Sequence, residues 1–289
     1  MKRAEELTIG IVGLGLMGAA IARALRSCGA ARQLLAFDKN EDTLSKALSM
    51  GLIDESFSSP KEMLGRCDLV FLCLNPSTLI HFMEEQMGHF KEGALLTDIA
   101  GIKGNICERL GKILRKDLDF IPGHPMAGAE KGGFENSCLV VFEGKNYILT
   151  PLERNHPHNL EFLKALIRRM GFARITETTA EEHDSKIAFT SQLCHVIASA
   201  LISCTSDLFP GDRAITRFGG GSFEDLTRIA MLNVPMWTEL FLENREELLK
   251  SIGQFEKSLE KIKNFIKEGD GEALSETLRD VREQRMAMA

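Results

Sequence analysis

The feature that most constrains the fold is a glycine pattern near the amino terminus, in the stretch LTIGIVGLGLMGAAIARALRS. A short apolar run comes first, then Gly13, Gly15 and Gly18, then a segment rich in alanine and leucine. At this spacing, glycines permit a tight turn, close approach of backbone to a phosphate, and close packing of a helix on a strand. A second apolar run, QLLAFD, ends in Asp38. Together these parts predict the first strand–helix–strand unit of a dinucleotide-binding domain.

The same segment also indicates which dinucleotide is bound. The predicted helix directs the free backbone N–H groups of its first turn, including those of Leu16 and Met17, toward the pyrophosphate. Asp38 can accept hydrogen bonds from the ribose hydroxyls, and its charge repels a 2′-phosphate. This favours NAD over NADP, although the adjacent Lys39 weakens the preference.

The α/β pattern continues to about residue 178. Apolar runs at 67–74, 93–99 and 118–123 predict buried parallel strands separated by helices. Residues 138–151 resemble a hairpin that turns at Glu143–Gly144–Lys145, and FARITE at 172–177 is the last strand expected. We therefore predict a Rossmann-type α/β domain, with a doubly wound parallel sheet, over residues 1–178.

From Thr179 onward the pattern is helical, which predicts an all-α domain over residues 179–289. Within AEEHDSKIAFTSQLCHVIASAL, the polar residues Gln192, His195 and Ser199 share one line on an otherwise apolar helix. Such a line forms hydrogen bonds between core helices or lines a pocket. Residues 248–266 carry a heptad seam, which predicts a long helix that packs against neighbours, within the chain or across a dimer.

Composition and charge exclude several classes of function. The 289 residues carry a net charge of −6, so neither nucleic acid nor an anionic membrane is an expected partner. An anionic ligand would need a local cationic pocket. The seven cysteines form no CxxC pair, which argues for a reducing compartment and against a disulfide framework or a zinc site. With no signal-peptide layout and no apolar stretch of membrane-spanning length recognised, a cytoplasmic location is expected.

Three later stretches narrow the class of protein. They are GHPMAGAEKGG at 123–133, EEHDSKIAFTSQLCH at 181–195 and GGGSFEDLTRIAMLNVPMWTELFLENREELL at 219–249. With the glycine pattern, they resemble the prephenate/arogenate dehydrogenase family of tyrosine biosynthesis over most of the chain. The resemblance implies an oxidative decarboxylation in which NAD takes a hydride from C4 of a cyclohexadienol ring and CO2 leaves from C1. It also implies a homodimer formed through the helical domain.

His124, in the first of these stretches, matches the family's catalytic histidine. When C4 loses hydride, its hydroxyl group must release a proton, and a neutral imidazole can accept it. The residue follows a predicted strand, at the edge where open α/β sheets bind ligands. Without the resemblance, a single histidine in a turn is more often structural.

Arg228, in DLTRIA, matches the family's carboxylate-binding arginine, whose planar guanidinium suits a carboxylate. Glu224 and Asp225 precede it at helical spacing, so a surface ion pair is the alternative. Arg217 is a weaker candidate for the same role.

Four further positions follow from the resemblance. Gln192 matches a substrate-contacting position and slightly favours arogenate or dual specificity. His195 is expected just behind the substrate, while Glu130 and Lys131 are expected at the mouth of the pocket.

One departure from the family pattern concerns the stretch DIAGIK, which follows a predicted strand. The family has a serine, whose hydroxyl contacts the ring hydroxyl and the catalytic histidine, where this chain has Gly101. Asp98 and Lys103 are retained, with Asp98 expected at the cofactor and Gly101 beside the substrate. Loss of one oriented hydrogen bond would cost roughly 1–3 kcal/mol of transition-state stabilisation.

The sequence leaves two other functions open. A β-hydroxyacid dehydrogenase of the same two-domain architecture would use a lysine on the first long helix of the second domain, where Lys186 lies. A non-catalytic NAD-binding regulator is conceivable because of Gly101.

Overall fold

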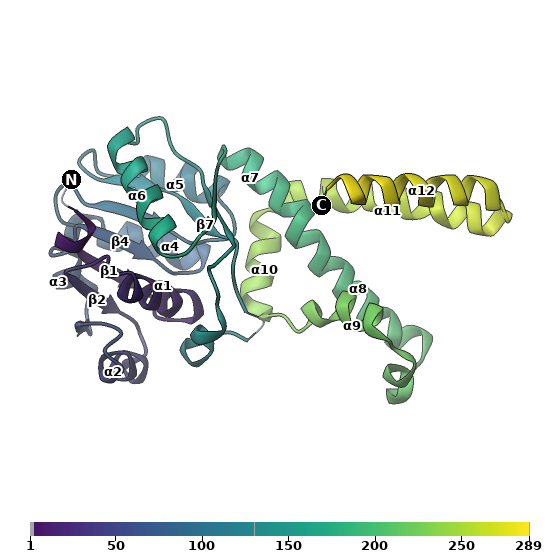
Figure 1. Ribbon diagram of the computed structural model, residues 1–289, viewed down its shortest axis with the longest axis horizontal. Coiled ribbons are helices and arrows are strands. Elements are labelled where there is room, and N and C mark those ends of the chain that lie inside the picture. The colour runs from purple at the N-terminus through teal and green to yellow at the C-terminus, as the bar shows by residue number, and fades with distance from the viewer. Residues whose placement is uncertain (1–2, 130, 289) are drawn as a thin grey trace.

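The computed structural model describes residues 3–129 and 131–288, as an α/β body from which a helical part projects (Figure 1). The body contains a six-stranded parallel sheet in the order β3-β2-β1-β4-β5-β6. Its strands are β1 (Thr8–Val12), β2 (Gln33–Phe37), β3 (Glu55–Phe57), β4 (Leu69–Leu72), β5 (Leu95–Asp98) and β6 (Asp119–Ile121). This is the doubly wound order, in which ligands bind at the carboxyl ends of the strands near the β1/β4 switch point. The predicted fold class is confirmed.

Alternate residues of the central strands pack on opposite faces of the sheet. On β4, Leu69 and Phe71 belong to one hydrophobic core, and Val70 and Leu72 to the other. The first core is covered by α1 (Leu16–Ser27), α2 (Glu41–Ser49) and α6 (Pro157–Arg169), and the second by α3 (Pro60–Leu64), α4 (Pro76–Gln86) and α5 (Gly104–Ile113). Burial on both faces explains why these strands are unbroken apolar runs in the sequence.

A second, three-stranded sheet carries the GHP segment. Strand β7 (Gly123–Pro125) pairs antiparallel with β8 (Asn146–Leu149), which pairs parallel with β9 (Arg174–Glu177). The single strand predicted at 118–123 is therefore two strands, β6 and β7, in different sheets.

The hairpin predicted over 138–151 is wrong. Residues 134–139 form a short 3-10 helix, η3 (Phe134–Leu139), and β8 pairs with β7 and β9 instead. Tyr147 and Leu149 of β8 are buried in the first core, whereas Leu139 and Val141 are more than half exposed. The apolar residues at 138–142 thus have the sequence pattern of a strand but do not pair with either sheet.

The helical part begins with one continuous rod. It comprises α7 (Ala180–Ile187), a π-helical turn η4 (Ala188–Gln192) and α8 (Leu193–Leu208). It continues with α9 (Gly221–Thr227), α10 (Val234–Glu243), α11 (Arg245–Glu268) and α12 (Gly271–Ala287). Short 3-10 turns are η1 (Ala4–Glu6), η2 (Met87–His89), η5 (Arg213–Phe218) and η6 (Arg228–Ala230).

Helix α10 joins the two parts of the molecule. Its Leu240 is buried in the second core of the α/β body, and Met236 and Trp237 pack against that core. The α11–α12 pair, which carries the predicted heptad seam, projects away from the body (Figure 1). Leu259 and Ile266 of this seam are more than half exposed in the single chain.

One helical run, Ala180–Leu208, has the length and apolar composition of a membrane-crossing helix, contrary to the sequence expectation. The indication is weak, because core helices of soluble proteins meet the same criteria. Only 28% of its most apolar window is buried in the single chain. The run therefore offers a large uncovered apolar surface.

Candidate active site

The glycine pattern forms a cradle between β1 and the start of α1. Gly13 has φ +89°, and a Cβ atom at Gly18 would lie 1.9 Å from the carbonyl oxygen of Gly13. Gly15 is the N-cap of α1 and has open space around it. The backbone N–H groups of Leu16 and Met17 in the first turn are thus available to a phosphate.

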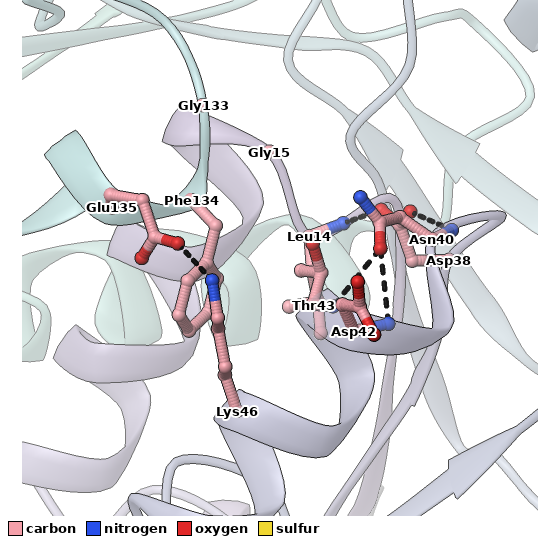
Figure 2. Close-up of a pocket in the computed structure, with 10 residues that line it drawn as sticks. All are labelled: Leu14, Gly15, Asp38, Asn40, Asp42, Thr43, Lys46, Gly133, Phe134 and Glu135. Carbon is pink, nitrogen blue, oxygen red and sulfur yellow. Dashed lines mark hydrogen bonds and ion pairs between the residues drawn. The ribbon is translucent and has the colours of Figure 1, made fainter.

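A cavity of about 410 Å³ lies beside this cradle (Figure 2). Asp38 is fixed at its wall, because its carboxylate accepts hydrogen bonds from the backbone N–H groups of Leu14, at 2.6 Å, and Asn40, at 2.8 Å. On the opposite side, Lys46 of α2 forms an ion pair with Glu135 of η3 (Figure 2). The size of the cavity and the anchored acid fit the adenosine half of a dinucleotide.

His124 lies in β7, where the carboxyl end of the main sheet meets the helical part. A Cβ atom placed on Gly101, just after β5, would lie 3.9 Å from His124 Cε1 and 3.4 Å from Leu240 of α10. Nδ1 of His124 lies 2.9 Å from Nε2 of His183 on α7. The imidazole thus sits between the two parts of the molecule, on the ligand-binding edge of the sheet.

A buried His–Asp pair stands behind His124. His183 has a fully buried side chain, and its Nδ1 lies 2.7 Å from Oδ1 of Asp184. That carboxylate also accepts the backbone N–H groups of Lys103 and Gly104, at the start of α5. The hydrogen-bonded series from His124 to Asp184 therefore connects β7, α7 and α5.

Asp98 requires a correction, because its carboxylate is not placed to bind a cofactor. Its side chain is fully buried and forms an ion pair with the equally buried Lys103. It also accepts the backbone N–H groups of Ala100 and Gly123. Both oxygens are engaged inside the protein, so Asp98 ties the end of β5 to the start of β7 and thereby helps to place His124.

Gln192 also differs from expectation. It is 1% exposed, its Nε2 donates to the carbonyl oxygen of Leu240, and its Oε1 accepts from Asn244. Asn244 donates in addition to the carbonyl oxygen of Asp184. These bonds leave Gln192 in the core between η4 and the α10–α11 junction, rather than facing a substrate. Of the two alternatives for the polar line, hydrogen bonding between core helices is therefore the one found at Gln192.

His195, on the same line, is only half-buried. Its ring stacks on Trp237 with centroids 3.6 Å apart, and its Nδ1 lies 2.9 Å from the carbonyl oxygen of Ser191. Because a carbonyl only accepts, Nδ1 is the donor, and the neutral ring keeps Nε2 as an acceptor. His195 is thus oriented by two contacts and can present one nitrogen to a ligand.

The cationic candidates are exposed residues. Arg228 is exposed at the junction of α9 and η6, a few residues before α10 begins. Arg217 and Lys131 are also exposed, and Glu130 lies outside the described residues. Lys186, the lysine required by the β-hydroxyacid alternative, has a 68% exposed side chain paired with Glu182.

The sequence interpretation missed His183 and Asp184, although a signal was present. His183, Asp184, Ile187 and Ala188 occupy positions i, i+1, i+4 and i+5 of one helix face, and all four are buried. A histidine and an acid on an apolar face must be hydrogen-bonded to something. The sequence could not show that their partners are His124 and the start of α5.

The three histidines of this region are held in the neutral form. Burial is the main cause that lowers the pKa of His124 well below its ordinary value, with nearby His183 and Lys103 adding to it. Burial likewise lowers the pKa of His183 and of His195. A neutral His124 is what a proton-accepting role requires.

These shifts predict loss of stability on acidification. Below the unfolded-state histidine pKa of about 6.5, the unfolded chain binds more protons than the native chain. The free energy of unfolding therefore falls as pH decreases through that value and is retained above it. Urea unfolding midpoints at about pH 7.5 and about pH 5.5 test this. The His183→Gln variant should show a smaller difference; an equal difference would contradict the assignment to these histidines.

A second prediction concerns Gly101. A side chain here would meet Leu240 and His124 at ordinary contact distances, and Gly101 does not have a positive φ. A serine hydroxyl would then lie next to the imidazole, and Gly101→Ser should raise kcat by roughly 5- to 100-fold. Gly101→Ala, which adds the carbon without the hydroxyl, is the matched control. Equal rates for the two variants would show that no hydrogen bond is gained.

The fold and site together define a two-domain, nucleotide-dependent dehydrogenase, with a glycine cradle in one domain and a histidine that contacts the helical second domain. Two family models match, "Prephenate dehydrogenase, nucleotide-binding domain" over residues 21–176 and "Prephenate dehydrogenase, dimerization domain" over residues 179–280. The chain belongs to the prephenate dehydrogenase family.

Individual relatives agree with this assignment. Prephenate dehydrogenase of Bacillus subtilis is 28% identical over 96% of this chain and 75% of the relative. The structure of prephenate dehydrogenase from A. aeolicus, in complex with hydroxyphenyl propionate and NAD+, is 33% identical with a TM-score of 0.89, covering 98% of this chain and 99% of that one. Synechocystis arogenate dehydrogenase is 27% identical with a TM-score of 0.82, covering 98% and 100%.

Proposed function

We propose that this protein catalyses the NAD-dependent oxidative decarboxylation of prephenate or arogenate to 4-hydroxyphenylpyruvate or tyrosine. The observation that carries the proposal is the neutral His124, half-buried between the sheet edge and α10 and hydrogen-bonded at one nitrogen only among its described contacts. The family and the relatives named prephenate and arogenate dehydrogenase support the substrate class.

In this mechanism the chain supplies a base, an anchor and a closed site. The glycine cradle and Asp38 would hold NAD, which would supply the acceptor for the hydride of C4. His124 takes the proton of the C4 hydroxyl as the hydride leaves, and returns it to the phenolate oxygen once CO2 has left C1. Leu240 and the ring of Trp237 limit the access of water on the side of α10.

Substrate anchoring is assigned to Arg228 and His195. Arg228 is exposed, and its planar guanidinium can form a bidentate pair with a carboxylate. His195 offers its acceptor nitrogen from the stack with Trp237. Asp38 selects NAD by its position at the wall of the adenosine cavity.

The working unit is proposed to be a homodimer formed through the helical part. Large apolar side chains of this part are more than half exposed in the single chain: Phe189, Leu208, Phe218, Leu226, Met231, Val234 and Leu242. A surface of this kind marks an interaction site, and the matching family model is named for dimerization. All seven cysteines are free thiols, in accord with a cytoplasmic location.

Initial rates of NADH formation test the proposed function. Prephenate and arogenate are each offered with NAD and with NADP, beside a panel of β-hydroxyacids. We expect turnover of at least one of the first two, with NAD preferred. Turnover of the β-hydroxyacids alone would overturn the proposal, and no turnover of any compound with intact NAD binding would favour a regulator.

A further inference from the structure

We propose that His183 and Asp184 act as positioning residues that set the tautomer of His124, so that its proton resides on Nδ1 and Nε2 is the basic nitrogen. The inference rests on the proposed function, since it specifies which atom performs the proton transfer. It follows from the direction of each hydrogen bond between Asp184 and His124.

The series starts at Asp184, which can only accept while it is ionised. Its carboxylate accepts the backbone N–H groups of Lys103, at 2.8 Å, and Gly104, at 2.7 Å, and it lies 2.7 Å from Nδ1 of His183. Because an ionised carboxylate has no proton to donate, Nδ1 of His183 must carry the proton of this third contact.

His183 in turn fixes the direction of its hydrogen bond with His124. Its fully buried side chain remains neutral, since burial lowers the pKa of His183. A neutral ring with a proton on Nδ1 has a lone pair on Nε2 and accepts there. His124 must therefore donate from Nδ1 across the 2.9 Å contact.

These hydrogen bonds define which nitrogen of His124 is basic. With its proton on Nδ1, the neutral ring has its lone pair on Nε2, away from His183. The ring carbon between the two nitrogens, Cε1, is the atom that faces Gly101. If His183 were an imidazolium ion, it would donate from both nitrogens, His124 would carry its proton on Nε2, and the base would be lost.

The charges around His124 and His183 favour the tautomer with the proton on Nδ1 of His124. Lys103, the N-cap residue of α5, opposes a second positive charge on either ring, and Asp184 and Asp98 balance its effect on His183. As His124 becomes protonated during the reaction, His183 can keep accepting from Nδ1. The positive charge is thus stabilised without a change of hydrogen-bond direction.

The first test reads the tautomer directly and needs no substrate. Protein labelled with 15N in histidine only is studied by NMR near pH 7.5, where ring nitrogens with and without a proton have well-separated shifts. The signals of His124 are identified by their absence in His124→Asn. We expect a protonated Nδ1 and an unprotonated Nε2 on His124. A proton on Nε2 would overturn the inference, whatever the enzyme turns over.

The second test separates positioning from a general structural role. His183→Leu removes the acceptor, whereas the amide oxygen of His183→Gln can still accept from His124. We expect His183→Leu to lower kcat about 100-fold, with KM changed less than about threefold, and to populate the other His124 tautomer. His183→Gln should recover most of the loss. His158→Leu, on the exposed surface of α6, is the matched control.

The two proposals fail in different ways. If prephenate and arogenate are not substrates, the proposed function fails, yet the tautomer in the wild-type protein is still measured. If they are substrates but His183→Leu retains both the rate and the tautomer of the wild type, the positioning role fails and the function stands. Equal losses in His183→Leu and His183→Gln would also refute the hydrogen-bond argument.

Discussion

Replacing His124 with asparagine is expected to lower kcat about 1,000-fold, within the range that positioned acid–base groups contribute. The asparagine amide can still donate to His183, so the fold and the buried series should persist. It has no nitrogen lone pair that can take a proton at neutral pH. KM for the substrate and the affinity for NAD should change little, because the cradle and the Asp38 cavity are untouched.

Steady-state NADH formation gives kcat and KM, and calorimetric titration with NAD gives the cofactor affinity. His158→Asn, the same change on the exposed face of α6, serves as the control and should behave as wild type. A His124→Asn variant that kept a tenth or more of the wild-type kcat would remove His124 from the proton transfer.

Lys103→Met is expected to destabilise the protein by about 3–5 kcal/mol, because it leaves the buried Asp98 carboxylate without its cation. Exposure of both side chains is zero, so water cannot compensate. The same carboxylate holds Gly123, next to His124, so activity should fall with stability. The measurement is the free energy of unfolding from urea titration.

Two further variants make this measurement specific. Lys112→Met, in helix α5 that Lys103 precedes, removes a lysine whose side chain is 68% exposed and paired with Glu108. It should cost less than about 1 kcal/mol. The double variant Asp98→Asn/Lys103→Met removes the unpaired charge and should recover part of the loss. Similar effects of Lys103→Met and Lys112→Met would show that the buried pair contributes no more than a surface pair.

The site illustrates how far sequence reasoning reaches. His124 and Gly101 were identified from motifs, and the structure brings them side by side. Asp98 was predicted to contact the cofactor and Gln192 the substrate, yet the polar atoms of both side chains form hydrogen bonds within the protein. Their residue types and positions were compatible with either role. Only the burial of each side chain distinguished the two.

The sequence by itself determined the nucleotide-binding half of the protein. The glycine spacing, the apolar strands and Asp38 act over short stretches of chain, where steric limits and periodicity leave little choice of structure. It also determined the change from sheet to helix near residue 178, for the same reason.

The tertiary structure decided how distant segments meet. His124 and His183 are 59 residues apart in the chain, and α10 reaches Gly101 across a longer separation. The 138–151 stretch had the pattern of a hairpin, but its strand β8 pairs with β7 and β9, which lie outside this stretch. Hydrogen-bond direction and burial depend on which surfaces pack together. Such pairings are fixed by the whole core, and no single stretch of sequence contains them.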